Sequence, residues 1–513
     1  MNKLLILALA LAGTSSVTAG VCVASVKANN QEENPVYLEF PEYLNGGSGH
    51  EDDPFLIRSS KDWDTFVSRL TSSIDDNPTQ RGVYYKLEED IRVYKQAGNH
   101  TKSLQFAGVF DGNGHSITYY ESSKKDTCGL FGSNSGIIKN LTTYGYISGN
   151  SNVASICAYN YGLIDNCTNY MTITGSKQYI GGIVAINGSD SQVGYVKNCT
   201  NYGDISSTSL TSLYKANGTC VGGILGFGYD YGDTIIESCY NYGNVFGISM
   251  LGGIVGQCKK NPSSTNLGIY KCKNYGDVKY NTETEEISYA GHIGGIVGYL
   301  GDGVNVKECS SSGTVVGYSG RNDSYWRGVG GIVGSFYKSN IADCLSFSDV
   351  SSYYMSGGIV GYCEKTYSKT IENCLATGKI HADLENAGGI IGRTNGVAVN
   401  NNIGATTIDC GKDSGPIIGK VGSSVTQTGN LVYSLSLNGK ELFKIIGMFD
   451  YNQTYTSSEA SNLMSLISDL KNNLSGNNDL DLLNSTFPLN KLNTYEDELD
   501  DIIAHLKTFE EEE

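Results

Sequence analysis

Residues 251–256 read Leu-Gly-Gly-Ile-Val-Gly, and residues 272–278 read Cys-Lys-Asn-Tyr-Gly-Asp-Val. Both stretches recur along the chain in the same order. The first, called here the glycine box, occurs ten times, counting two degenerate copies. The second, called here the cysteine box, has the form C-x-N-x-G-x-[IV] and follows each of the first eight copies. Because ordered internal repetition is the mark of a repeat architecture, the sequence predicts an elongated repeat array.

The interval between glycine boxes sets the size of one repeat. The shortest steps are 26 and 27 residues, and the longest is 42. We interpret the 26–27 residues as one coil and the excess as loops inserted at corners, which a coil tolerates because it contacts only its neighbours. The longer insertions are expected at residues 207–214, 261–266, 281–288 and 318–326.

The repeat favours β-structure over helix. Gly-Gly flanked by Ile and Val is a poor helix composition. The cysteine box alternates with period two, which places alternate residues on opposite faces of a strand. Ten coils stacked at about 4.8 Å would be roughly 50 Å long. We therefore expect an all-β fold, a parallel β-helix or β-solenoid of about ten coils, with an N-terminal cap and a small helical C-terminal region. The glycine pairs are expected at tight corners or at close approaches of two backbones.

Half of the fourteen cysteines occupy the first position of a cysteine box. Stacked coils would align them in a column with a spacing of about 5 Å. We expect small, buried, free thiols; disulfides within the column are the alternative, although the spacing is short and the count is odd. The chain has no C-x-x-C pair, so a metal cluster is not expected. The cysteine column consists of Cys167, Cys199, Cys239, Cys272, Cys309, Cys344 and Cys374.

Two further columns follow from the cysteine box. Asn169, Asn201, Asn241 and Asn274 lie two places after the cysteine. Their amides are expected to hydrogen-bond from coil to coil, as Asn ladders do in cross-β assemblies. The next residue is a tyrosine in five coils, and this column either packs on itself or offers a platform for sugars. The tyrosine column consists of Tyr144, Tyr170, Tyr202, Tyr242 and Tyr275.

The charge distribution argues against nucleic acid as a partner. The net charge is −17, and residues 431–513 alone carry fifteen Asp and Glu against five Lys, a balance of −10. Binding to phosphates needs a clustered basic surface, which this chain lacks. The same argument makes anionic lipid an unexpected partner.

The N-terminus has the pattern of a secretory signal peptide. A short positive start, Met1 to Lys3, precedes an apolar run over residues 4–12 and then small residues up to Gly20. A membrane-spanning helix needs about 20 continuous apolar residues, and residues 14–16 interrupt this run. Cleavage is expected after Gly20 or Ala28. We therefore expect a secreted or cell-surface protein and no membrane insertion.

The paired boxes resemble the GLUG motif, a repeat of bacterial surface proteins that also occurs in immunoglobulin-A-cleaving metallopeptidases. The stretches that carry the resemblance are residues 106–117 (Phe-Ala-Gly-Val-Phe-Asp-Gly-Asn-Gly-His-Ser-Ile), Gly129–Gly132 and Ile137–Leu141. An opening segment, Gly47–Ile57, and a short helix expected over residues 61–70 also look like the start of such proteins. The resemblance covers about residues 46–420 and implies architecture rather than activity.

The catalytic motif of those peptidases is absent from this sequence. It requires H-E-x-x-H, and the His-Glu pair of this chain, His50-Glu51, is followed by two Asp and a Pro. Asp111–His115 looks superficially like a calcium loop, but it lacks the closing Glu, and Asn-Gly is a strong turn signal. The sequence therefore predicts no catalytic, metal or cofactor residue, and no enzyme.

These observations divide the chain into four parts. We expect a signal peptide at residues 1–28, a spacer and cap at 29–105, GLUG-like solenoid repeats at 106–430, and an acidic, partly helical region at 431–513. The predicted function is an adhesin-like binding module or scaffold whose partner is a host or cell-surface protein or glycan. The alternative is a carbohydrate-active enzyme, a lyase or glycosidase, on a parallel β-helix. A groove where two or more carboxylates converge with a Lys or Arg would favour that alternative.

Overall fold

The structure is a computed structural model. It describes residues 46–71, 82–100, 105–208, 219–229, 234–259, 268–281, 291–318, 327–364, 369–423 and 425–432, and a few short pieces beyond residue 435. The predicted signal peptide lies outside these ranges, as do Cys22, most of the inserted loops and most of residues 431–513.

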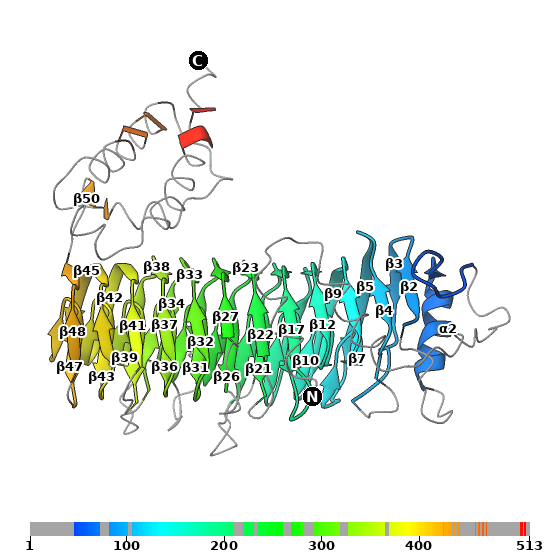
Figure 1. Cartoon of the computed structure of the whole chain (residues 1–513), viewed down its shortest axis with the longest axis horizontal. Coiled ribbons are helices and arrows are strands. Elements are labelled where there is room, and N and C mark those ends of the chain that lie inside the picture. The colour runs from blue at the N-terminus through cyan, green and yellow to red at the C-terminus, as the bar shows by residue number, and fades with distance from the viewer. Residues whose placement is uncertain are drawn as a thin grey trace, which may run out of the picture.

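The described chain forms a parallel β-solenoid, as the repeat predicts. Coils stack along one axis, and corresponding strands of successive coils pair in parallel to make three long sheets (Figure 1). We call them sheets A, B and C, with 13, 26 and 10 strands in the described residues. The ten strands of sheet C correspond to the ten glycine boxes, which confirms the expected number of coils.

Sheet A contains one strand from each of the ten coils that have a sheet C strand, and three more, two before them and one after them. Its strands are β1 (Phe55–Ile57), β2 (Tyr84–Leu87), β4 (Val109–Asp111), β8 (Ile137–Lys139), β12 (Leu163–Asp165), β17 (Gly194–Lys197), β22 (Thr234–Glu237), β27 (Gly268–Tyr270), β32 (Asn305–Lys307), β37 (Asn340–Ala342), β41 (Thr370–Glu372), β44 (Ala398–Asn400) and β48 (Thr426–Thr428).

Sheet B contains the cysteine boxes and the start of each glycine box. Its strands are β3 (Ile91–Val93), β5 (Ser116–Ser122), β6 (Thr127–Cys128), β9 (Thr142–Gly149), β10 (Asn152–Ala154), β13 (Thr168–Asn169), β14 (Thr172–Gly175), β15 (Tyr179–Gly181), β18 (Thr200–Asn201), β19 (Ile205–Ser207), β20 (Cys220–Gly222), β23 (Tyr240–Asn241), β24 (Val245–Gly247), β25 (Met250–Gly252), β28 (Lys273–Asn274), β29 (Val278–Tyr280), β30 (Ile293–Gly294), β33 (Ser310–Ser311), β34 (Val315–Val316), β35 (Val329–Gly330), β38 (Leu345–Ser346), β39 (Val350–Gly357), β42 (Leu375–Gly388), β45 (Ile403–Cys410), β46 (Ser414–Gly415) and β49 (Leu431–Val432).

Sheet C contains the second half of each glycine box. Its strands are β7 (Phe131–Asn134), β11 (Cys157–Asn160), β16 (Val184–Asn187), β21 (Leu225–Gly228), β26 (Val255–Cys258), β31 (Val297–Leu300), β36 (Val333–Phe336), β40 (Val360–Cys363), β43 (Ile391–Thr394) and β47 (Ile418–Val421). A two-stranded antiparallel pair, β50 (Ser436–Leu437) and β51 (Lys440–Glu441), follows the solenoid.

One hydrophobic core runs through the interior of the stacked coils. In the middle of sheet A each strand contributes one inward residue that pairs with its equivalents above and below, for example Ile236, Ile269 and Val306, all fully buried. Burial of aliphatic side chains is the dominant favourable contribution to folding, about 25 cal/mol per Å² of apolar surface. The period-two alternation of the sequence thus becomes alternation between core and exterior.

The second glycine of each pair marks a close approach between backbones, the second of the two expected roles. A Cβ on Gly253 would lie 2.2 Å from the carbonyl oxygen of Gly295 and 2.2 Å from Cγ of Asn274. Gly223 is in the same position, with 2.1 Å to the oxygen of Gly253 and 2.4 Å to Cγ of Asn241. The cysteine-box asparagine therefore packs on the glycine pair, and this contact joins the two repeated motifs in space.

The turn from sheet A into sheet B has a left-handed backbone in nine coils. It falls on the residue directly before the cysteine position, a feature that the sequence analysis missed. Asn tolerates this conformation best, but Lys and Glu also occur, because the pairing of both flanking strands fixes the turn. The residues are Asn140, Asn166, Asn198, Ser238, Lys271, Glu308, Asp343, Asn373 and Asn401, with φ between 51° and 60°.

A helix closes the N-terminal end of the solenoid. Helix α2 (Ser60–Thr71) matches the helix expected over residues 61–70. Ser59 precedes it, and its hydroxyl accepts a hydrogen bond from the amide of Asp62 at 3.2 Å, as an N-cap does. Trp63 and Phe66 are fully buried and contact the ring of Phe131 in the core. Because β1 and β2 already pair in sheet A, the parallel ladder begins within the region assigned to spacer and cap.

We expect Gly253→Ala to lower the free energy of unfolding by about 1–3 kcal/mol, because the new methyl group overlaps the next coil. Urea unfolding followed by circular dichroism measures the change. Thr172→Ala, at an exposed position of β14, is the control and is expected to change stability little. An unchanged midpoint for Gly253→Ala would contradict the close approach of the two coils.

Candidate functional site

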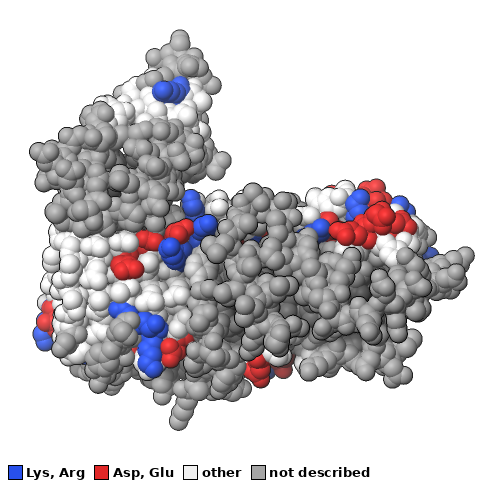
Figure 2. Space-filling view, in the orientation of Figure 1, with Lys and Arg blue, Asp and Glu red and all other residues white. Residues whose placement is uncertain are grey.

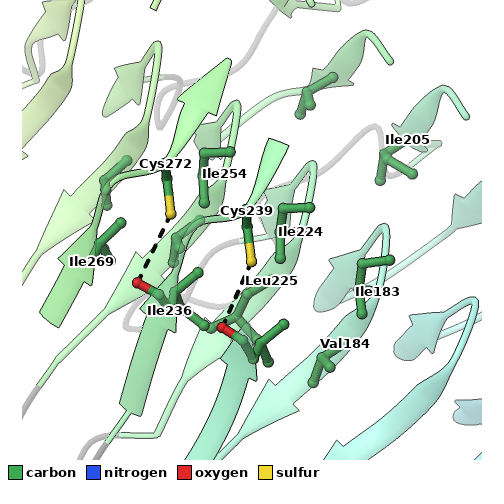
Figure 3. Packing of buried hydrophobic residues seen from close by; sticks show 14 of the residues in the cluster. Ile183, Val184, Ile205, Ile224, Leu225, Ile236, Cys239, Ile254, Ile269 and Cys272 are labelled. Carbon is green, nitrogen blue, oxygen red and sulfur yellow. Dashed lines mark hydrogen bonds between the residues drawn. The ribbon is translucent and has the colours of Figure 1, made fainter. Parts of the chain in front are cut away.

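The seven cysteines of the cysteine column lie at equivalent positions of successive coils, and all are buried and free. Each amide that follows a column cysteine bonds to the carbonyl of the column cysteine before it, for example Thr200 N to Cys167 O at 2.9 Å. Figure 3 shows Cys239 and Cys272 with their sulfur atoms directed into the aliphatic core. Leu141 precedes the column and Asn402 follows it in the same position.

The thiols of this column are hydrogen-bonded and shielded from water. Each sulfur donates to the carbonyl two residues earlier, at 3.0 Å for Cys199 and 3.2 Å for Cys272. Burial raises the pKa of both groups well above the usual value of a thiol. All seven sulfur atoms are buried in the aliphatic core, and a buried free cysteine behaves as a small apolar side chain. The column therefore contributes packing rather than reactivity.

The asparagine column forms a continuous chain of side-chain hydrogen bonds. Nδ2 of Asn169 donates to Oδ1 of Asn201, Asn201 to Asn241, and Asn241 to Asn274, each at 2.7 Å. Each Nδ2 also donates to the backbone carbonyl two residues later, at 2.7–3.1 Å. All four side chains are buried, so these bonds satisfy groups that would otherwise be costly to bury.

A second amide ladder lies at the end of the first sheet C strands and was missed in the sequence. Asn134 donates to Asn160 at 2.8 Å, and Asn160 donates to Asn187 at 2.7 Å. All three are fully buried. The signal was present, since each Asn stands three residues after the first residue of its sheet C strand. It covers three coils only and gives way to Gly228 in the fourth.

The tyrosine column lies on the outer face of sheet B, and its five rings stack on one another. Neighbouring ring centroids are 4.7–5.0 Å apart, with interplanar angles of 5–9°. Each side chain keeps about two-fifths of its surface exposed, from 39% for Tyr275 to 44% for Tyr202. Stacking between neighbours, one of the two expected roles, is therefore observed.

This arrangement decides what the tyrosine column can contact. The neighbouring rings cover the faces, so a sugar cannot lie flat on a ring within the column. The exposed surface consists of ring edges and hydroxyl groups, repeated once per coil. A tyrosine hydroxyl is protonated at neutral pH and can donate a hydrogen bond, and burial raises the pKa of Tyr202 and Tyr242 further. The column is thus a regular row of donors and acceptors on an aromatic base.

A surface pocket of about 280 Å³ lies further along sheet B, on β39, β42 and β45. Asp349, Lys379, His381 and Asp409 are among its lining residues, so carboxylates and a lysine do converge here. Nε2 of His381 lies 2.9 Å from Asp383, and its Nδ1 lies 3.1 Å from Asp409. None of these residues was identified from the sequence, because pairing of adjacent coils brings them together.

Hydrogen bonds already engage the carboxylates and the histidine of this pocket. Carboxylates at both nitrogens favour the charged imidazolium, and Asp383 chiefly raises the pKa of His381. Asp349 accepts the backbone amide of Lys379 at 2.7 Å, as Asp204 accepts the amide of Asn244 in an earlier coil. The pocket is also open, with 62% of the Asp409 side chain exposed. It therefore lacks the buried, poised carboxyl pair that glycosidases use.

The charges of the described surface are mixed. On the face shown in Figure 2, the described Lys and Arg stand beside Asp and Glu. Ion pairs such as Lys139–Asp111 and Lys197–Glu237, at 3.2 and 2.9 Å, join adjacent coils. Within the described ranges no group of three His, Cys, Asp or Glu could hold a metal ion. No described helix has the length and apolarity that crossing a membrane requires.

The fold and its columns define a parallel β-solenoid repeat protein. No family model matches the chain, and no curated protein matches it. Among solved structures, the chain is similar to one described as a "putative immunoglobulin A1 protease" from Bacteroides ovatus, with 18% identity and a TM-score of 0.37. The match covers 76% of this chain and 87% of that one. A likeness of this degree carries no argument about activity, and the GLUG relationship stays a resemblance.

We expect Asn201→Ala to lower the free energy of unfolding by about 1–3 kcal/mol, because Asn169 loses an acceptor and Asn241 loses a donor in the buried interior. Thermal unfolding followed by circular dichroism tests this. The control is Thr200→Ala, which changes a half-exposed side chain of the same strand. Equal effects of the two substitutions would show that the amide ladder adds nothing to stability.

The pKa of His381 is expected above its ordinary value of 6.5. A folded-state pKa above the unfolded one means that the contribution to stability is fully present below pH 6.5 and is lost as the pH rises through the folded pKa. NMR titration of the imidazole measures it. Asp383→Asn should lower this pKa more than Asp409→Asn does, and a wild-type pKa at or below 6.5 would refute the double ion pair.

Proposed function

We propose that this chain is a secreted or cell-surface binding protein of the adhesin type, with a GLUG-like solenoid as its scaffold. The tyrosine column is its contact surface, and the partner is a host or cell-surface protein or glycan. Export is supported by the signal-peptide pattern of residues 1–28, and the GLUG relationship by the order of the repeated boxes.

The observation that carries the proposal is the exposed stack of five tyrosines. Interior columns of a solenoid are explained by stability. Stacking also stabilises the tyrosine column, but in addition it leaves a regular row of ring edges and hydroxyl groups at the surface. Tyrosine is also favoured at protein interfaces, because it offers a rigid contact area with a polar tip. A row that repeats once per coil suits a ligand that is itself extended or repetitive.

A carbohydrate-active enzyme is the second candidate, and the pocket around His381 is the place where it would act. We favour binding because Asp349, His381 and Asp409 of the pocket are already engaged in mutual or backbone hydrogen bonds. General acid–base catalysis needs a group that exchanges a proton with the substrate in the transition state. Asp383 and Asp409 instead both favour the protonated form of His381 and raise its pKa.

The test uses the mature full chain on a glycan array and on immobilised extracellular-matrix proteins. Wild-type protein is expected to bind at least one probe. The double variant Tyr202→Phe/Tyr242→Phe keeps the stack and removes two hydroxyls, so affinity should fall about tenfold or more, at roughly 1 kcal/mol for each hydrogen bond. Tyr202→Ala/Tyr242→Ala should abolish binding.

Tyr94 supplies the matched control, because it is a tyrosine outside the column with 66% of its surface exposed. Tyr94→Ala should leave binding unchanged. Binding that survives both double variants would refute the role of the column. Release of sugars from the array by wild-type protein but not by Asp409→Asn would instead establish the enzyme.

A further inference from the structure

The outer face of sheet B is almost free of charge over four successive coils. These coils contribute residues 116–122, 142–148, 168–174 and 200–206, and strand pairing holds the four ranges in register. In each range the first, third, fifth and seventh residues point outward. Fifteen of these sixteen side chains are Ser, Thr or Tyr, and the exception is Asp204. We call the sixteen outward positions the hydroxyl face.

Charged side chains return on both sides of the hydroxyl face. Arg92 of β3 is exposed and pairs with the first of the four coils. At the other end, after one further uncharged coil, β28 and β29 bring Lys273 and Lys279 to the outward positions. Beyond them the same sheet carries the charged pocket around His381. The lack of charge is therefore a property of one part of sheet B and not of the whole sheet.

Tyr146 belongs to the hydroxyl face but lies outside the tyrosine column. Its side chain is 47% exposed, more than that of any member of the column. On one side its ring lies 5.2 Å from the ring of Tyr120, at an interplanar angle of 60°. On the other side the residue in register is Thr172, which is exposed and too short to cover a tyrosine ring. A sugar can therefore stack on Tyr146, which it cannot do within the column.

The chemistry of the hydroxyl face matches that of an uncharged sugar. Ser, Thr and Tyr hydroxyls donate and accept hydrogen bonds, as sugar hydroxyls do. Small-ligand sites combine aromatic surface with a few polar groups, which here are Thr172 beside Tyr146 and Asp204 at the same position of the next coil. Three members of the tyrosine column, at residues 144, 170 and 202, extend the aromatic surface.

Two other kinds of partner match these sixteen positions less well. Acidic sugars are bound through Lys or Arg, and the hydroxyl face contains neither. Its one charged residue, Asp204, would repel an anion. Protein partners are held by apolar anchors and Arg in well-packed pockets, and none of the sixteen outward side chains is aliphatic.

We propose that the hydroxyl face binds a neutral glycan, with one sugar ring stacked on Tyr146 and hydrogen-bonded to Thr172 and Asp204. Three coil steps of about 4.8 Å make the face about 14 Å long, so a short oligosaccharide can contact all four coils. This inference rests on the proposed binding function and narrows its partner to an uncharged carbohydrate.

Binding of the mature full chain to an array of neutral, sialylated and sulfated glycans tests the proposal. Wild-type protein is expected to bind neutral glycans, and added salt should not weaken the binding because no ion pair contributes to it. Thr172→Tyr places a ring in register with Tyr146 and covers it, so affinity should fall about tenfold or more. Thr314→Tyr, at the equivalent position of a coil beyond the face, is the matched control and should leave affinity unchanged.

Tyr146→Ala removes the ring without adding an atom and should also lower affinity about tenfold or more. Circular dichroism checks that each variant is folded. Neutral-glycan binding that survives both Thr172→Tyr and Tyr146→Ala would overturn the inference, and the proposed function would still stand if Tyr202→Ala/Tyr242→Ala abolished that binding.

Other outcomes separate the remaining partners. Wild-type binding restricted to sialylated or sulfated glycans, or to matrix proteins, would overturn the inference and leave the proposed function intact. A wild-type dimer that Tyr146→Ala converts to monomer would overturn it as well, since a second copy would then occupy the face. Wild-type protein that binds no probe would contradict both the inference and the proposed function.

Discussion

The contact on which this structure depends is the one between a buried asparagine and a glycine pair. The asparagine amide bonds to the next amide along the axis, and the second glycine leaves space for it. A larger residue at Gly223 would meet both the Asn241 side chain and the carbonyl of Gly253. The side-chain ladder therefore sets the packing between two walls of the coil, while the backbone ladder sets the rise. Where Asn gives way to Ser311, the chain of amides ends and the bond lengthens to 3.4 Å.

Much of the fold could be predicted because all ten coils share the same inward and outward positions. Alternation of inward and outward residues, the cysteine column and the asparagine column were all readable, since each depends on residue type at a fixed position. The left-handed turn before the cysteine was not, because Asn166, Lys271 and Glu308 share a conformation and no chemistry. The strand pairing in the two flanking sheets imposes the left-handed conformation, and the residue at the turn only has to be able to adopt it.

The candidate site could likewise be predicted only in part from the sequence. The tyrosine column was predicted as a column, but its sequence could not tell whether ring faces or ring edges are exposed. That depends on how the five rings are oriented to one another, and the observed stacking covers their faces. The cluster at His381 was unreadable for a different reason. His381 and Asp409 are 28 residues apart in the sequence. Only the register of β42 on β45 makes them neighbours.

Regularity also limits what such a scaffold can do chemically. Every outward position of a strand has a neighbour about 4.8 Å above and below, so polar side chains find hydrogen-bond partners on the adjacent coils. Asp349 and Asp204 illustrate this, since each accepts a backbone amide of the following coil. Catalysis needs groups that are held but left unsatisfied until the substrate arrives, whereas binding needs only a surface that matches its ligand. A row of tyrosine hydroxyls on stacked rings meets the second requirement, because stacking fixes the rings while leaving each hydroxyl at the edge of the column.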